Sequence, residues 1–242
     1  MNEIVYLDNS STTKPCKRAI DNINTALCDN WGNPSSLHTL GIEAETAVSA
    51  ARECVARSVG ARSDEIIFTG SGTEANNTAL LSCLKAAKRG GRIITTAIEH
   101  PSVLETCKRL TAAGLEVIYL KPANDGKVLP DDLKNALTDN TLLVSMMLVN
   151  NETGAVHPIA EAAALTKRIS PKALFHCDAV QAYGKLPINV KLLGVDLLTA
   201  SGHKIHGPKG IGFLFRKKGV NIPPFITGGG QESGMRSGTE PV

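Results

Sequence analysis

One lysine lies where a solvated surface charge would be out of place. Lys204 follows the β-type run 196–200 (DLLTA) and lies between Gly202 and the pair Gly207-Pro208. A lysine held in a partly apolar pocket has a lowered pKa and can form a Schiff base with an aldehyde. Lys204 is therefore a candidate for covalent chemistry on a carbonyl compound.

An aspartate ends a second run of this kind, residues 173–178 (ALFHCD). Period-two alternation puts Asp178 and His176 on one face of the strand and Cys177 on the other, where a small core residue is expected. Ligands of open α/β sheets bind at the carboxyl ends of the strands. Asp178 could there fix a protonated ring nitrogen, with Gln181 bonding a ring oxygen. An aspartate that only caps the next helix explains the residue equally well.

A glycine-rich turn, residues 70–77 (GSGTEANN), follows the run 65–69 and opens a predicted helix. Backbone N–H groups at such a helix start, from Gly72 onward, form a phosphate cradle to which Thr73 adds a hydroxyl. An ordinary turn capped by Ser71 or Thr73 is the simpler explanation of the turn alone. The turn is neither a Walker loop nor GxGxxG, which argues against nucleotide triphosphate chemistry.

A histidine is expected at the same edge of the sheet. His100 comes shortly after the run 92–96 and directly before Pro101. It could stack on a cofactor ring and handle protons, or merely cap a helix. His203 and His206 are three residues apart, but no cysteine or carboxylate at ligand spacing joins them, so no metal site is expected.

Taken together, these features match the needs of one cofactor. Asp178 suits a pyridinium nitrogen, Lys204 an aldehyde and the glycine-rich turn a phosphate, and pyridoxal 5′-phosphate (PLP) carries all three groups. The conjunction is more specific than any of its parts. A Rossmann-like domain that binds another phosphate ligand through residues 70–73 is the alternative, and it predicts no role for Lys204.

Strand-like and helix-like segments alternate along the chain, which indicates a parallel sheet between helices. The spacing becomes shorter towards the C-terminus, so part of the sheet is expected to be antiparallel there. Strands are predicted at 65–69, 92–96, 116–120, 142–146, 173–177, 196–200 and 212–215, and helices from near Thr73, Pro101, Pro130 and Pro158.

Composition excludes several classes of protein. The 242 residues carry a net charge of +3 and are 42% hydrophobic, as in a soluble globular protein. The longest apolar run, residues 142–149, is too short to span a bilayer, and no secretory signal is visible, so we expect a cytoplasmic protein with no membrane partner. The six cysteines form no CxxC pair, and most are expected to be reduced, half-buried packing residues. Lysines and arginines are interleaved with aspartates and glutamates rather than clustered, and only nine residues are aromatic, which argues against nucleic-acid binding.

The ordered motifs resemble the cysteine desulfurases of the class V aminotransferase group. The resemblance runs almost from end to end of the chain. It implies a fold-type I PLP-dependent transferase large domain, with a mostly parallel mixed sheet sandwiched by helices. The motifs are 6–13 (YLDNSSTT), 32–36 (GNPSS), 69–77 (TGSGTEANN), 96–100 (TAIEH), 149–154 (VNNETG), 176–181 (HCDAVQ), 201–212 (SGHKIHGPKGIG) and 228–239 (GGGQESGMRSGT).

The resemblance also implies roles for individual residues. Lys204 would form the Schiff base with PLP, and His100 would stack on the ring; these two are the expected catalytic residues. Asp178 would pair with the pyridinium nitrogen, and Gln181 would bond the phenolic oxygen. Asn151 would approach cofactor and substrate. The phosphate would be held by Gly72, Thr73, Ser201 and His203, and by Thr239 of a neighbouring subunit, which implies a homodimer.

The reaction implied is the removal of sulfur from L-cysteine, giving L-alanine and an enzyme persulfide for iron–sulfur cluster assembly or thio-modification. A sulfur-acceptor or scaffold protein is a possible partner. The family's sulfur-accepting cysteine matches none of the six here. The expected organisation is a segment, 1–14, that would pack with a small domain, and a PLP-binding large domain, 15–242, with the C-terminal small domain absent. Thr239 and Pro241 would begin a helix there.

Other functions stay open on the sequence alone. The chain could be a catalytically incomplete PLP-binding fragment. Another class V enzyme, such as a selenocysteine lyase or an aminotransferase, is the same-fold alternative, although the run of desulfurase motifs disfavours it.

Overall fold

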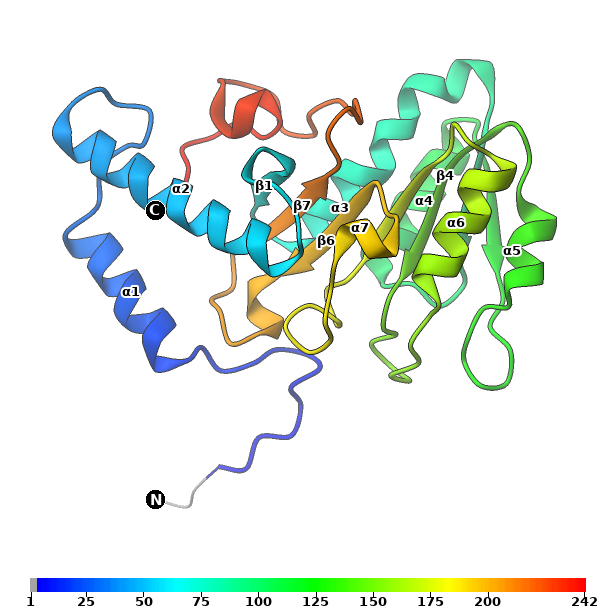
Figure 1. Cartoon of the computed structure of the whole chain (residues 1–242), viewed down its shortest axis with the longest axis horizontal. Coiled ribbons are helices and arrows are strands. Elements are labelled where there is room, and N and C mark those ends of the chain that lie inside the picture. The colour runs from blue at the N-terminus through cyan, green and yellow to red at the C-terminus, as the bar shows by residue number, and fades with distance from the viewer. Residues whose placement is uncertain (1–3) are drawn as a thin grey trace.

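The computed structural model describes residues 4–242, with side chains for all of these except residues 86–89. A seven-stranded sheet has the order β1-β7-β6-β5-β4-β2-β3, with helices packed on both faces (Figure 1). The strands are β1 (Ile66–Thr69), β2 (Arg92–Thr96), β3 (Glu116–Leu120), β4 (Thr141–Met147), β5 (Leu174–Asp178), β6 (Leu197–Ser201) and β7 (Gly212–Arg216).

The α-helices are α1 (Lys17–Cys28), α2 (Thr39–Ser58), α3 (Gly72–Leu81), α4 (Pro101–Ala112), α5 (Pro130–Ala136), α6 (Ile159–Ile169) and α7 (Val190–Leu193). Short 3₁₀ helices are η1 (Ser63–Glu65), η2 (Ser82–Arg89), η3 (Gly202–Lys204) and η4 (Gln231–Gly234). Apolar side chains of α3 and α4 pack on one face of the sheet, and those of α2, α5 and α6 on the other. The predicted α/β architecture is confirmed.

One strand, β7, runs opposite to all the others in the sheet. The strands from β3 through β2, β4 and β5 to β6 are parallel, whereas β7 runs antiparallel to both β6 and β1. The expected antiparallel part is therefore confirmed, because the connection from β6 to β7 is too short for a crossover helix. β5 and β6 stay parallel although α7 between them has only four residues.

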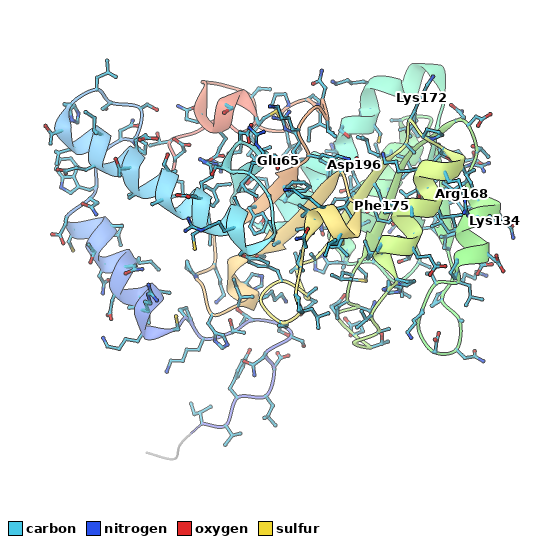
Figure 2. All side chains as sticks on the ribbon, viewed as in Figure 1. Glu65, Lys134, Arg168, Lys172, Phe175 and Asp196 are labelled. Atoms are coloured by element: carbon cyan, nitrogen blue, oxygen red, sulfur yellow. The ribbon has the colours of Figure 1, made fainter. Side chains whose placement is uncertain are left out.

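An aspartate fastens the start of the β5–β6 pair. Asp196 Oδ2 accepts a hydrogen bond from the backbone N–H of Phe175 at 2.8 Å, and it pairs with Lys167 Nζ of α6 at 2.6 Å. Figure 2 shows Phe175 and Asp196 close together at this end of the sheet. The pair is thus fixed in register at the edge opposite the carboxyl ends.

The alternation predicted for β5 is present. Cys177 is buried in the core beneath α6, whereas His176 points to the other face and bonds Ser145 Oγ of β4 at 2.8 Å and Thr199 Oγ1 of β6 at 3.1 Å. Burial lowers the pKa of His176 to about 3, so this histidine stays neutral. It ties three strands together directly below Asp178.

Helix boundaries follow the prolines closely. α4 and α5 begin at Pro101 and Pro130, because a first-turn residue needs no free N–H. α6 begins one residue later than predicted, after Pro158. Residues 239–242 have no regular structure, and the helix predicted to begin near Thr239 stays a prediction.

The prediction of mostly half-buried cysteines is wrong. Three of them are buried and three are exposed, because the first three lie on η2, on the sheet-facing side of α4 and in β5, and the others on α1, α2 or the segment before α1. The buried ones are Cys83, Cys107 and Cys177, and the exposed ones are Cys16, Cys28 and Cys54.

The N-terminal part lies to one side of the sheet (Figure 1). α1 has no buried residue, and the side chains of Ile4 and Leu7 are largely exposed. The expected packing of residues 1–14 on a small domain stays a prediction, and residues 1–3 lie outside the described part. Among the described residues, no helix combines the length and apolar character that a membrane crossing requires.

Candidate active site

A cavity of about 520 Å³ opens where the parallel strands end. β2, β4, β5 and β6 all deliver residues to it from their carboxyl ends, and the N-terminus of α3 forms one wall. This is the edge at which open α/β sheets bind ligands. The lining residues are Asp8, Ser10, Ser11, Ser71, Gly72, Thr73, Asn76, His100, Ser102, Met147, Asn151, Glu152, Asp178, Val180, Gln181, Ser201, His203 and Lys204.

The structure brings together nine of the ten residues expected to form the site. They are Gly72, Thr73, His100, Asn151, Asp178, Gln181, Ser201, His203 and Lys204. The tenth, Thr239, does not line the cavity of its own chain. It is exposed in the irregular segment after η4.

Asp178 is a buried carboxylate with two donors. Its Oδ1 accepts from the backbone N–H of Val180 at 2.9 Å, and its Oδ2 accepts from Asn76 Nδ2 at 2.7 Å. Burial raises the pKa of Asp178, while the Val180 and Asn76 hydrogen bonds and the nearby His100 and Lys204 lower it. No helix follows for it to cap, since 180–185 are turns. Asp178 can therefore present negative charge to a cationic ring nitrogen.

Lys204 ends η3 and is half-buried. Its Nζ donates to the backbone carbonyls of Ser10 and Ser11, at 2.5 and 2.7 Å. Burial and the positive charge of Lys185 lower the pKa of Lys204, against a smaller opposite effect of Asp8 and Asp178. A lowered pKa makes the free amine, which is the nucleophile for an aldehyde, more available at neutral pH.

An N-terminal segment, residues 8–16, lies along residues 203–206, the stretch that contains Lys204. The backbone N–H of Thr13 donates to the carbonyl of His203 at 2.9 Å, and that of Cys16 to the carbonyl of His206 at 2.9 Å. The Thr13 hydroxyl also accepts from the His206 N–H at 2.7 Å. These contacts fix the position of Ser10 and Ser11 over Lys204.

A hydrogen-bonded chain joins Lys204 to a second lysine. Gln181 Nε2 donates to the Ser10 carbonyl at 2.8 Å, the same carbonyl that Lys204 contacts. Gln181 Oε1 accepts from Lys185 Nζ at 3.0 Å. Because Lys185 can only donate, it fixes the amide so that the NH₂ group of Gln181 faces the cavity.

We expect Lys185→Met to slow the attachment of PLP to Lys204 at neutral pH. The substitution removes the charge that lowers the pKa of Lys204, so less free amine is present, and the rate should fall a few-fold. Borohydride trapping of the Lys204 peptide, followed by mass spectrometry across pH, measures this. Lys185→Arg, which keeps the charge, is the matched control. An unchanged pH profile for Lys185→Met would contradict the assignment.

His100 serves both of the roles considered for it. It is the N-cap of α4, with its Nδ1 accepting from the Ser102 backbone N–H at 3.1 Å, and it also lines the cavity. Since Nδ1 accepts a hydrogen bond, the proton of the neutral ring lies on Nε2. The ring therefore offers an N–H donor at Nε2 and a flat face for stacking.

The turn before α3 is tightly packed. Ser71 caps the helix by accepting from the Glu74 N–H at 3.1 Å, and Glu74 Oε2 accepts from the Gly70 N–H at 2.9 Å. A Cβ on Gly72 would lie 2.8 Å from Val180 Cγ2. A side chain at position 72 would therefore have to displace Val180 at the place where α3 meets the ends of β5 and β6.

Glu99 is a second buried carboxyl group below the cavity. Its Oε1 accepts from Thr96 Oγ1 at 2.7 Å and from the Met147 N–H at 2.9 Å, while its Oε2 is buried with no partner among the described residues. Burial raises the pKa of Glu99 to about 8, with a smaller contribution from Asp178 and opposing hydrogen bonds. Glu99 is thus neutral at pH 7 in the folded chain.

We expect Glu99→Gln to flatten the pH dependence of stability. Wild-type Glu99 keeps its proton when folded and loses it when unfolded, so stability falls as pH rises from about 4.5 towards 8. Over that range the free energy of unfolding of the variant should rise relative to the wild type by roughly 3–5 kcal/mol. Urea unfolding between pH 5 and 8.5 tests this, with exposed Glu105→Gln as the control. Parallel curves for Glu99→Gln and the wild type would contradict it.

Several site residues were missed by sequence reasoning. Asn76 and Ser102 reach the cavity from α3 and α4, and Ser10 and Ser11 contribute backbone carbonyls rather than side chains. Asn76 carries the one available signal: it is a polar residue among the alanines and leucines of a buried helix face. The contacts of the Ser10 and Ser11 carbonyls could not be predicted, because every residue type has a backbone carbonyl.

The residues present fit PLP. The cavity combines a buried carboxylate, an amine of lowered pKa and the start of a capped helix, which suit a ring nitrogen, an aldehyde and a phosphate respectively. Gln181, oriented as a donor, suits a phenolic oxygen. No other cofactor considered above uses all of these groups.

Comparison with known proteins agrees with this chemistry. The profile of the aminotransferase class-V family matches residues 5–241. The chain belongs to that family. A cysteine desulfurase of Trichormus azollae is 48% identical over 240 residues, 99% of this chain and 59% of the relative. This chain spans about three fifths of the length of the curated relatives that it matches.

Solved structures similar to this chain confirm the predicted fold-type I architecture. A NifS-like protein superimposes with a TM-score of 0.95 at 42% identity, covering 98% of this chain and 65% of its own. SspA, solved in complex with cysteine, gives a TM-score of 0.94 at 37% identity, covering 98% and 68%. Membership of this family, with cysteine desulfurases among the relatives, implies PLP as the cofactor.

Proposed function

We propose that this chain binds PLP and carries the cofactor site of a cysteine desulfurase. The observation that supports this most strongly is the convergence of Lys204, Asp178 and the start of α3 on one cavity. The names of its class-V relatives favour desulfuration over transamination, and one structural relative binds cysteine. Selenocysteine lyase and aminotransferase activities are the same-fold alternatives.

Each residue has a proposed part. When bound, PLP withdraws electrons from the α-carbon of an amino-acid substrate. Asp178 faces the ring nitrogen with its negative charge, and Lys204 Nζ binds the aldehyde carbon and moves protons. His100 stacks on the ring with its proton on Nε2. Gln181 donates to the phenolic oxygen, and Asn151 contacts cofactor and substrate. The phosphate lies against Gly72, Thr73, Ser201 and His203.

The sulfur acceptor is the open part of the reaction. The C–S bond of L-cysteine breaks, the sulfur passes to a thiolate as a persulfide, and the remaining carbon skeleton takes up a proton and leaves as L-alanine. Cysteines of this chain do not line the cavity. We therefore propose that the acceptor is a cysteine outside these 242 residues or an external thiol.

The oligomeric state, the sulfur-accepting partner and the cellular location are proposals as well. Thr239 is exposed and outside its own cavity, which suits a threonine that reaches the phosphate site of a second copy in a homodimer. Delivery of sulfur to an acceptor or scaffold protein for iron–sulfur cluster assembly, in the cytoplasm, stays a prediction.

The test is product analysis with L-cysteine, PLP and dithiothreitol. Alanine and sulfide in equal amounts would support a desulfurase that uses an external thiol. A PLP-bound chain that makes neither product would support a cofactor-binding fragment instead. Alanine and selenide from L-selenocysteine, with nothing from L-cysteine, would favour the lyase. Pyruvate from alanine together with a keto-acid acceptor would favour the aminotransferase.

A further inference from the structure

Two buried side chains lie between the two ring-binding residues of the site. Asn76 of α3 is 1% exposed and Ser102 of α4 is 8% exposed. Asn76 Nδ2 lies 2.7 Å from Asp178 Oδ2 and 2.8 Å from Ser102 Oγ. Ser102 Oγ lies 2.8 Å from His100 Nδ1. The four side chains form one unbroken hydrogen-bonded chain.

The direction of every bond in this chain is determined. A carboxylate accepts, so the Asn76 NH₂ group must face Asp178, and its second hydrogen then goes to Ser102 Oγ. With its oxygen accepting from Asn76, the Ser102 hydroxyl is free to donate to His100 Nδ1. That nitrogen also accepts from the Ser102 backbone N–H at 3.1 Å, so it carries no proton, as the chain requires.

The side-chain oxygen of Asn76, Oδ1, does not fix the orientation of the amide group. Asn76 Oδ1 is buried and has no hydrogen-bond partner among the described residues. Turning the amide over would place Oδ1 against both Asp178 and Ser102, which is favourable only if Asp178 becomes a donor. The orientation of the amide therefore depends on whether Asp178 carries a proton.

We propose that Asn76 and Ser102 are positioning residues that couple the charge state of Asp178 to the ring of His100. With Asp178 ionised, the chain holds the His100 proton on Nε2, the nitrogen not engaged by Ser102. With Asp178 neutral, the amide turns over, Ser102 donates to Asn76 instead, and His100 loses that donor. Asp178 and His100, the two groups proposed to contact the PLP ring, thus change together. That these groups contact PLP rests on the function proposed above.

A field effect is the competing explanation. The positive charge of protonated His100 lowers the pKa of Asp178 through space, and Lys204 acts in the same direction. Glu99 and Cys177 are the other titratable groups close to Asp178. Such an interaction needs neither Asn76 nor Ser102, whereas the hydrogen-bonded coupling needs both.

A double-mutant cycle separates the two explanations. The protein is labelled with ¹⁵N-histidine, without PLP, at a pH where the imidazole of His100 is neutral. The signal of His100 is assigned by its loss in His100→Gln. The Nδ1 shift is then measured in the wild type, Asp178→Asn, Ser102→Ala and the double variant.

Asp178→Asn, which replaces the charged acceptor with a neutral amide that can donate to Asn76, is expected to move the Nδ1 shift when Ser102 is present and to leave it unmoved in Ser102→Ala. Ser82→Ala is the matched background: the Ser82 hydroxyl donates to the Ala79 carbonyl of α3, outside the Asp178–His100 network, so the Asp178→Asn effect should stay intact. An equal effect of Asp178→Asn in all backgrounds, or no effect in any, would overturn the proposal.

A second variant that interrupts the hydrogen-bonded network keeps the proposal testable if Asp178→Asn misfolds. If Asp178→Asn does not fold, Asn76→Ala is measured with and without Ser102→Ala. Its effect on His100 is expected to vanish in the Ser102→Ala background, and an equal effect in both overturns the proposal. Because the protein lacks PLP throughout, a failure of the wild type to take up PLP would contradict the proposed function and leave this result standing.

Discussion

Lys204→Ala is expected to abolish the visible absorbance of the PLP-loaded protein and to lower any L-cysteine turnover by about 10³-fold or more. Among the residues whose side chains the structure describes, Lys204 is the only lysine that lines the cavity. Without its amine the aldehyde has no lysine to bind in the cavity, and the amine proposed to move protons is lost. Absorbance spectra and sulfide release at saturating PLP measure both effects.

The control for this variant is a lysine at the opposite edge of the sheet. Lys172 is exposed and precedes β5, at the strand's amino end (Figure 2). Lys172→Ala should leave spectrum and turnover unchanged. A Lys204→Ala protein that keeps the band would contradict the role of Lys204, because some other amine would then hold the aldehyde.

Asp178→Asn is expected to reduce turnover by about 10²- to 10³-fold while PLP still binds. The amide has the shape of the carboxylate but no charge to hold a proton on the ring nitrogen. It also satisfies only one of the two donors, the Val180 N–H and Asn76 Nδ2, that Asp178 accepts from. Steady-state kinetics and titration with PLP separate the loss of rate from the loss of affinity.

Stability should change in a direction that depends on pH. Burial raises the pKa of Asp178 above its usual value, so the wild type loses stability as pH rises through that range, and the neutral variant does not. The unfolding free energy of Asp178→Asn relative to wild type should therefore increase between pH 3.5 and pH 7, as urea titrations of the PLP-free proteins can show. A relative stability that falls with rising pH, or a variant that matches wild-type turnover, would contradict the account.

The site could be predicted from the sequence wherever strand periodicity decided it. Asp178 ends one short β-type run and Lys204 follows another, and alternation on β5 correctly assigned Cys177 to the core and Asp178 to the other face. The turn at Gly72 follows a β-type run and opens a helix, and it indicated a phosphate site only in conjunction with Lys204 and Asp178. In these places local pattern and tertiary position coincide.

Long-range contacts between common residue types could not be predicted. The Ser10 and Ser11 carbonyls reach Lys204 across more than 190 residues, and any residue type supplies a carbonyl. Asn76 bonds Asp178 across 102 residues, and its role appears only when α3 is packed on β5. The predicted position of Thr239 depends on a second copy, so a single chain leaves it untested.

The most direct test of the central claim is chemical. The purified chain is incubated with PLP, reduced with borohydride, digested, and mapped by mass spectrometry. We predict one pyridoxyl-modified lysine, Lys204, at a stoichiometry near one per chain, together with loss of the visible band on reduction. Modification spread over exposed lysines such as Lys172, with Lys204 unmodified, would contradict the assignment of this cavity as a PLP site.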